Sequence, residues 1–276
     1  MKKISIVSLA IITVIVFGAL AVPKTLAEKQ DKNKNSVKIE GATPENPVVY
    51  LGEAYDKKVG KIVEGYAIVH YAKNNIKPTK PNSGAVCYGY ISKGAKWKSI
   101  ENWTFDSALN SQNLDPYVLK DNMEADISKW EEAVDGDINN SMTVNILGSG
   151  SVGPVLATLG KSLDYKNEVK FAGIDNSGAI AVTYIWGIFS GKISQKEIVE
   201  WDQVYDNVDF NWSMTGEADK MDFENIATHE LGHSIGLGDL YNSVCNQETM
   251  YGYASEGQTN KRDLNAGDIM GIDLLY

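Results

Sequence analysis

Short apolar stretches separated by turn sequences fill the middle of the chain. Residues 168–174, 179–188 and 197–205 are rich in β-branched and aromatic residues. The sequences Asp-Asn-Ser-Gly and Ser-Gly lie between them and are typical of turns. Residues 96–105 predict a further strand. Its apolar side chains come from Trp97, Ile100, Trp103 and Phe105. Together these stretches predict a mixed β-sheet.

A helix is predicted from Pro116 to about Val134. Proline is favoured in the first turn of a helix, where its missing N–H is not needed. The apolar residues of this stretch recur at helical spacing and approximate one face, so we expect a core helix. They are Val118, Met123, Ile127 and Trp130.

The first 27 residues have the pattern of an export signal. A basic start at Lys2 and Lys3 precedes an uncharged apolar run over residues 4–22. Small residues at Thr25 and Ala27 favour cleavage after Ala27, and Ala19 with Ala21 offers a rival position. We therefore expect a secreted protein. The alternative is an uncleaved signal that anchors the chain at the cell surface, because the run is near the length that spans a bilayer.

Two breaks divide the part of the chain that follows. Residues 28–36 are charged and nearly free of apolar residues, which predicts a mobile tether. Residues 59–71 suit a hairpin or small sheet segment. The sequence KPTKPNSG over residues 77–84 interrupts that pattern and predicts a linker. We therefore expect an N-terminal segment at 28–86, either an inhibitory prosegment or an accessory domain, and a catalytic domain at 87–276.

The net charge and the cysteine content limit the possible partners and the cellular compartment of the protein. The chain of 276 residues has a formal charge of −10, and loss of residues 1–27 would remove three lysines and no acid, leaving −13. Such acidity argues against a nucleic-acid partner. The acidity is explained most simply by solubility outside the cell. In the alternative, some of the carboxylates bind calcium. A cysteine pair in an exported chain, here Cys87 and Cys245, is more often a disulfide than two free thiols.

Calcium ligands are oxygen atoms, and several turn-like positions offer them. The candidates are Asp175, Asn176, Asp206, Asn207 and Asp209. Ordinary turn residues look the same, so the sequence assigns no calcium site.

The sequence HELGHSIGLGD at residues 229–239 carries the chemistry. Positions i and i+4 of a helix lie on one face, about 6 Å apart along the axis, so His229 and His233 can bind one metal ion. Asp222 is placed to cap this helix. Its buried side would consist of Phe223, Ile226, Ala227 and Leu231. Glu230 lies beside the metal face, where it can take a proton from a water molecule.

Catalytic zinc usually has three protein ligands and one open position. Gly236 and Gly238 can end the helix and fold the chain back, which would bring Asp239 to the ion. The remaining histidine, His70, lies across the expected boundary, so proximity favours Asp239. In the alternative, Asp239 caps a turn and the third ligand lies elsewhere.

This motif resembles that of the metzincin clan of zinc endopeptidases. The extended motif is matched at His229, Glu230, His233, Gly236 and Asp239. The third ligand is usually His, whereas Asp is the pattern of snapalysin-like enzymes. The surroundings look more like matrixins, including those of archaea and bacteria.

Two later features extend the resemblance, which covers residues 96–276. The sequence ETMYGY is similar to the methionine turn of the clan, with Met250 as its methionine. Tyr251 and Tyr253 follow it, and in related enzymes a tyrosine near this turn can assist the transition state. The sequence GDIMGIDLLY looks like a closing matrixin helix. Its apolar stripe is Ile269, Ile272 and Leu275.

The resemblance implies an α+β fold with a mixed, mostly parallel twisted sheet, an active-site helix and a C-terminal helix. It also implies one catalytic zinc, Glu230 as general base, and hydrolysis of peptide bonds in proteins or peptides. We expect a monomer. There is no histidine-rich strand for a second zinc. The flanks of Cys87 (GAVCYGY) do not match the matrixin cysteine latch. We therefore favour a disulfide that ties Cys87 to Cys245, in the loop before Met250.

A second hypothesis comes from a different class of protein. The chain would be a catalytically silent secreted protein, for metal binding or adhesion, that keeps the site. Retention of Glu230 argues against it, because metal binding alone does not require a base.

Overall fold

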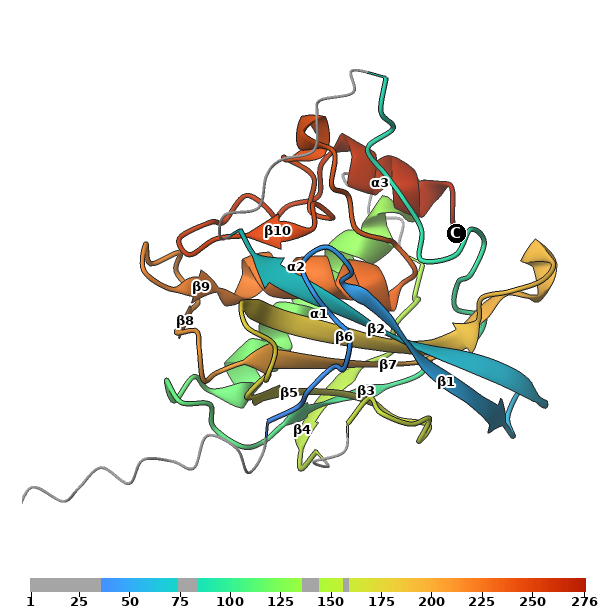
Figure 1. The fold of residues 1–276 in the computed structure, drawn as a ribbon, viewed down its shortest axis with the longest axis horizontal. Coiled ribbons are helices and arrows are strands. Elements are labelled where there is room, and N and C mark those ends of the chain that lie inside the picture. Colours follow the sequence, from blue (N-terminus) through green and yellow to red (C-terminus); the bar gives the residue numbers. More distant parts are fainter. Residues whose placement is uncertain (1–35, 74–83, 136–143, 156–158) are drawn as a thin grey trace, which may run out of the picture. The chain divides into compact units, whose positions relative to one another are not determined.

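The computed structural model describes residues 36–73, 84–135, 144–155 and 159–276 (Figure 1). The expected signal peptide, nearly all of the tether and most of the KPTKPNSG linker lie outside these residues. The described part belongs to one compact unit, Lys32–Tyr276. No helix in the described ranges has the length and apolar character needed to cross a membrane.

Most of the described strands form one sheet. In chain order its strands are β1 (Val48–Asp56), β2 (Lys61–Ala72), β3 (Trp103–Asp106), β4 (Gly150–Gly153), β5 (Asn167–Ala172), β6 (Ala179–Ile188), β7 (Glu197–Asp206) and β10 (Tyr253–Ala254). Two short strands, β8 (Trp212–Ser213) and β9 (Met221–Asp222), pair separately.

The order of the large sheet is β1-β2-β6-β7-β5-β3-β4, with β10 added on β2. The strands β4, β3, β5 and β7 pair in parallel. Strand β6 is antiparallel to β7, and β2 is antiparallel to both β6 and β1. The mixed sheet with its parallel part confirms the expected fold class.

Three α-helices complete the fold. They are α1 (Pro116–Glu132), α2 (Phe223–Ser234) and α3 (Ala266–Asp273). Short 3₁₀ helices occupy Ala133–Asp135, Ile193–Gln195 and Ser243–Cys245. Helices α1 and α2 contact each other, and both contact the sheet on the same face (Figure 1). The predicted Pro116 start is confirmed, and Asp115 caps α1 by accepting a hydrogen bond from Tyr117 N at 2.9 Å.

The apolar core lies on both faces of the sheet. On the helix side it includes Trp130 of α1, Ile226 of α2 and Trp201 of β7. On the opposite side, Val37 and Ile39 from the N-terminal segment pack against strand residues of β2, β6 and β7. Because both faces are covered, β6 and β7 are buried along most of their length, which explains the nearly continuous apolar sequence of β6.

The expected boundary near residue 86 does not coincide with a division between compact units, because it lies inside the unit Lys32–Tyr276. Strand β2 lies inside the sheet between β1 and β6, and Val37 bridges to Ile174 at the end of β5. The prolines of the linker indicated a local break, whereas β2, which precedes the linker, pairs with β6 and β10 more than a hundred residues later. The expected strand at 96–105 is also shorter, because only Trp103–Asp106 pairs with β4 and β5.

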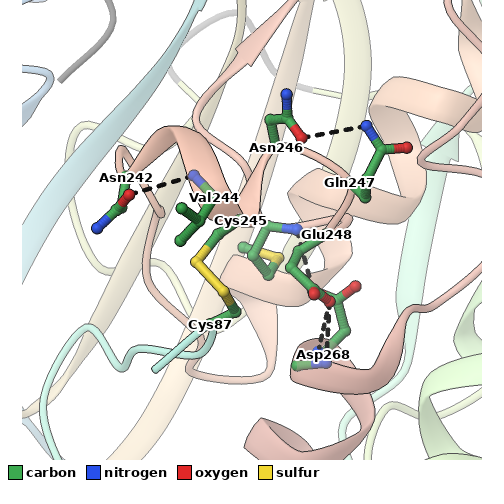
Figure 2. The surroundings of a disulfide bond; sticks show 10 residues. Cys87, Asn242, Val244, Cys245, Asn246, Gln247, Glu248 and Asp268 are labelled. Carbon is green, nitrogen blue, oxygen red and sulfur yellow. Dashed lines mark hydrogen bonds between the residues drawn. A yellow bond between two sulfur atoms is a disulfide. The ribbon is translucent and has the colours of Figure 1, made fainter. Parts of the chain in front are cut away.

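The expected disulfide between Cys87 and Cys245 is confirmed (Figure 2). It joins the segment that follows β2 to the 3₁₀ helix Ser243–Cys245. The bond closes a sequence separation of 158 residues. A cross-link over so long a loop stabilises the fold chiefly by reducing the conformational entropy of the unfolded chain.

Replacement of both cysteines, Cys87→Ser with Cys245→Ser, should lower the free energy of unfolding by about 4 kcal/mol. For a domain of this size that corresponds to a fall of about 10 °C in the thermal midpoint. Thermal unfolding followed by circular dichroism measures the effect. Reductant should lower the midpoint of the native chain and leave that of the double variant unchanged; equal midpoints for all samples would contradict the expectation.

A buried carboxyl group on β7 links stability to pH. Burial raises the pKa of Glu200 to about 8, against the two backbone N–H groups of Asp164 and Tyr165 that donate to its carboxyl group. The folded protein therefore keeps a proton on Glu200 at pH values where the unfolded chain, with an ordinary carboxyl pKa, has released it. Stability should fall as pH rises between those two pKa values.

The free energy of unfolding should decrease on the order of 3 kcal/mol from pH 5 to pH 8 because of Glu200. Denaturant unfolding at a series of pH values measures this slope. The variant Glu200→Gln keeps a hydrogen-bond acceptor and cannot ionise, so its slope should be shallower. An unchanged slope in the variant would contradict the assignment to Glu200.

Candidate active site

Helix α2 begins at a well-satisfied cap. The Asp222 carboxylate accepts a hydrogen bond from Asn225 N at 3.0 Å, as the sequence predicted. Arg262 also donates to Asp222, at 2.6 and 2.8 Å. The predicted buried side is present, because Phe223, Ile226, Ala227 and Leu231 have no exposed surface. Cap and apolar side together fix the helix axis and hence the direction of its histidines.

His229 and His233 lie on one face of α2, and both are fully buried. Nδ1 of His229 lies 2.7 Å from the Thr249 carbonyl oxygen, and Nδ1 of His233 lies 3.0 Å from that of Leu237. Each Nδ1 therefore carries the proton and donates it to a carbonyl. The Nε2 atoms keep their lone pairs, as a metal ligand requires.

The chain reverses directly after α2. Gly236 has a φ of 110°, and a Cβ at this position would lie 2.7 Å from the Ala95 carbonyl oxygen. Gly238 N donates to Gly89 O at 3.0 Å, which fixes the returning chain. This reversal brings Asp239 Oδ1 to 3.2 Å from His229 Nε2 and 3.5 Å from His233 Nε2.

These three atoms form a site that fits a metal ion. All are buried, and none makes a hydrogen bond within the described residues. Burial opposes the charge on Asp239, yet the two histidines outweigh it and lower the pKa of Asp239 well below its ordinary value. Burial lowers the pKa of His229 to about 3, so this ring is neutral. A carboxylate and two imidazoles around one point are a donor set that zinc accepts.

Glu230 lies beside this site and is also fully buried. Its Oε2 accepts a hydrogen bond from Thr183 Oγ1 of β6 at 2.5 Å, and its Oε1 lies 3.1 Å from His70 Nδ1. Burial raises the pKa of Glu230 to about 7, despite the nearby His233. Both carboxylate oxygens are thus held by partners from the sheet.

The sequence analysis missed His70 and Lys261. His70 was set aside because it lies before the expected boundary, but strand β2 places it at the site, where its ring centroid is 4.0 Å from that of His229. Nζ of the buried Lys261 lies 3.3 Å from His70 Nε2 and also donates to Tyr251 O. Burial lowers the pKa of Lys261 to about 7. No spacing pattern pointed to Lys261, because its partners are distant in the chain.

Met250 lies beneath the metal-facing helix. Its Sδ is so close to Gly232 of α2 that a Cβ there would come within 2.2 Å of it. Asp268 of α3 holds this turn by accepting hydrogen bonds from Thr249 N at 2.7 Å and Met250 N at 3.1 Å. Glu248 in turn accepts from Asp268 N at 3.3 Å, as Figure 2 shows. The closing helix therefore supports the turn that carries Met250.

The tyrosine that contacts a candidate ligand is Tyr241, which the sequence analysis did not single out. Its hydroxyl group donates to Asp239 Oδ2 at 2.9 Å. The ring of Tyr253 packs on Tyr241, with centroids 5.2 Å apart, and Tyr251 packs on Tyr253 at 5.8 Å. A hydroxyl two residues after the aspartate is a local signal that could have identified Tyr241.

Two of the candidate calcium ligands, Asp206 and Asn176, hold backbone groups. Asp206 accepts hydrogen bonds from the backbone N–H groups of Ile174, Val208 and Asp209, each at 2.7 Å. Asn176 bonds the backbone of Ile39 at 2.9 Å in both directions. These contacts give Asp206 a role in its own turn and Asn176 a role in holding the N-terminal segment. Calcium binding stays a prediction without a site.

Comparison with known proteins gives two matches. The matrixin family model matches residues 163–276, which contain β5 to α3 and all three candidate ligands. Metalloendoproteinase 2-MMP of Arabidopsis thaliana is 35% identical over 77 residues, which cover 25% of this chain and 19% of that protein. The match thus spans about a fifth of the length of this curated relative. On this evidence the resemblance to matrixins is confirmed over residues 163–276.

Proposed function

We propose that this protein is a secreted zinc-dependent endopeptidase. The observation that carries the proposal is the convergence of His229, His233 and Asp239 on one buried point, with Glu230 beside it. Zinc binding alone would need the three ligands. The carboxylate next to them supplies what hydrolysis needs in addition, a base.

Several residues of this chain have separate roles in the proposed hydrolysis. When bound, zinc supplies a Lewis acid that makes water more acidic and polarises a peptide carbonyl group. Nε2 of His229, Nε2 of His233 and Oδ1 of Asp239 would hold it. Glu230 takes the proton of the attacking water and returns it to the leaving amine nitrogen. A pKa of about 7 suits a group that both accepts and donates a proton near neutral pH.

Export from the cell is part of the proposal. The signal-like residues 1–27 support it, as does the Cys87–Cys245 disulfide, because disulfides persist mainly in oxidising compartments. The acidic chain, with its formal charge of −10, suits a soluble protein that acts on peptides or proteins and does not bind nucleic acid.

The variant Glu230→Gln tests the catalytic part of the proposal. It should lose casein hydrolysis by at least about a hundredfold, because a general base typically contributes that much to rate. Its zinc content, measured by mass spectrometry of the purified protein, should equal that of the native chain. Equal casein hydrolysis by both would refute the assignment of Glu230.

Tyr241→Phe tests the support of the third ligand. Loss of the hydroxyl donor frees Asp239 Oδ2 and should lower zinc affinity by about tenfold, as is typical when a hydrogen bond to a metal ligand is removed. Competition with a chromophoric zinc chelator measures the affinity. Tyr253→Phe is the matched control, since its ring packs on Tyr241, and it should leave zinc affinity unchanged. An equal effect of both variants would show that aromatic packing, and not the hydrogen bond, matters.

A further inference from the structure

A hollow opens where three segments of the chain meet, beside the last residues of the sequence. Its walls come from residues 88–98, from residues 193–196 between β6 and β7, and from Leu274 and Leu275 after α3. Figure 1 shows these segments near one another, on the side where the C-terminus is marked. The volume of the hollow is about 490 Å³, within the range of about 300–1,000 Å³ that is typical of small-ligand pockets.

The hollow is basic, although the chain as a whole is acidic. Four of the residues that line it are lysines: Lys93, Lys96, Lys98 and Lys196. None of the described residues in its lining is an aspartate or a glutamate. The chain has 36 acidic and 26 basic residues, and its net charge is −10. The local charge is thus opposite in sign to the net charge, and it favours an anionic ligand.

Two of these lysines are not neutralised by the protein. Nζ of Lys196 donates to Ser92 Oγ at 2.6 Å and has no ion pair within the described residues. Lys93 is exposed, and its side chain has neither a hydrogen bond nor an ion pair in the same part of the chain. Because an ammonium group has three N–H donors, both lysines can donate to a carboxylate of a ligand.

The hollow also has an apolar part. Tyr88 and Tyr90 lie in its wall, with ring centroids 5.8 Å apart. Ile193 and Leu274 also line it and are 58% and 61% exposed. Covering such side chains with an apolar group is favourable, because it removes apolar surface from water. A well-matched ligand therefore carries an apolar group beside its negative charge.

The walls are held together within the described structure. The hydroxyl group of Tyr90 donates to the carbonyl oxygen of Gly271 in α3 at 3.1 Å. Gly94 has a φ of 83°, and a Cβ at this position would collide with Ile193, so a glycine is needed where these two walls meet. A pocket that is formed in advance binds its ligand with a smaller loss of conformational entropy.

The contrast between local and net charge favours a short ligand over an extended polyanion. Charges are screened beyond about 8 Å at physiological ionic strength. A short segment inside the hollow therefore interacts mainly with the lysines. A nucleic acid or an anionic bilayer would extend past the hollow and be repelled by a chain with a net charge of −10.

One wall of the hollow pairs with the turn that carries a candidate metal ligand. Tyr90 forms a β-bridge with Leu237, and Gly89 O accepts a hydrogen bond from Gly238 N at 3.0 Å. Asp239 is the next residue in the sequence. A segment bound in the hollow is therefore held against the same part of the chain that delivers Asp239.

We propose that this hollow binds an acidic peptide segment in which carboxylate groups flank a large apolar side chain. The carboxylates pair with Lys93 and Lys196, and the apolar side chain covers Tyr88, Tyr90 and Leu274. The inference goes beyond the proposed function, because this binding requires neither the candidate metal ligands nor the candidate base.

Isothermal titration calorimetry with unlabelled peptides tests the proposal. The probe is acetyl-Glu-Asp-Phe-Asp-Glu-amide, and its neutral match is acetyl-Gln-Asn-Phe-Asn-Gln-amide. The full chain is used with Glu230→Gln, so that the peptides stay intact. The acidic peptide should bind at least about tenfold more tightly than the neutral one, because hydrogen bonds between charged groups are stronger than those between neutral groups. Added sodium chloride should weaken its binding.

The double variant Lys93→Gln with Lys196→Gln removes both unpaired charges and keeps polar side chains there. It should bind the acidic peptide about tenfold more weakly, because two ion pairs are lost. Lys93→Gln alone, at an exposed position, should weaken binding about threefold, and it keeps the test decisive if the double variant does not fold. The control is Lys57→Gln with Lys61→Gln, two exposed residues outside the hollow, which should bind as the parent does.

A third peptide tests the apolar part of the hollow. With alanine in place of phenylalanine, the acidic peptide should bind at least about tenfold more weakly, because less apolar surface is buried. Equal binding of the alanine and phenylalanine peptides would show that the hollow recognises charge alone, which contradicts the proposed ligand.

Three further results would overturn the proposal. The first is equal binding of the acidic peptide by the parent and by the lysine variants. The second is inorganic phosphate that binds as tightly as the peptide, which would assign the hollow to a simple anion. The third is cosedimentation with phosphatidylglycerol vesicles, lost in the double variant, without peptide binding. Casein hydrolysis by the chain with native Glu230 decides the proposed function separately, since none of these binding results depends on it.

Discussion

The candidate site is constrained by three buried polar atoms that face one another and make no hydrogen bond within the described residues. Burying Nε2 of His229, Nε2 of His233 and Oδ1 of Asp239 in this way is unfavourable unless a cation offsets the cost. The surrounding fold holds that arrangement. Backbone carbonyls fix the tautomers of both rings, Gly236 permits the reversal that delivers the aspartate, and Tyr241 holds the other carboxylate oxygen. The three side chains are therefore a donor set that fits a metal cation.

The carboxylate of the candidate base, Glu230, is positioned differently from the three candidate ligand atoms. Glu230 shares its helix with both histidines, yet its two oxygens are held from the sheet, by Thr183 on β6 and His70 on β2. Lys261 then contacts the other side of the His70 ring at 3.3 Å. A neutral imidazole with Nδ1 donating to Glu230 can accept from Lys261 at Nε2, so the three side chains form one connected row. This row exists only while β2 remains paired with β6.

The matrixin match begins at residue 163. It therefore covers the strands β5, β6, β7 and β10 of the large sheet, together with helices α2 and α3. Strands β1 and β2 lie outside it. The elements that would hold zinc and hydrolyse a peptide therefore belong to the matched part, whereas the strand that places His70 beside Glu230 does not. Both parts nevertheless belong to one sheet, because strands that are distant in the sequence can pair with each other.

Features that depend on the local spacing of residues could be predicted from the sequence. A four-residue spacing on a capped amphipathic helix places His229 and His233 on one face, and two glycines permit the bend that returns Asp239. The β-rich stretches of β6 and β7 and the start of α1 at Pro116 could be predicted for the same reason.

Which distant strands pair, in contrast, was settled only in the folded molecule. The hydrogen bonds between strands join backbone groups, which nearly all residue types share. The pattern of β2 therefore predicted a strand but did not identify β6 as its partner. For this reason the linker prolines suggested a separate segment, and His70, Thr183 and Lys261 entered the site only through long-range packing.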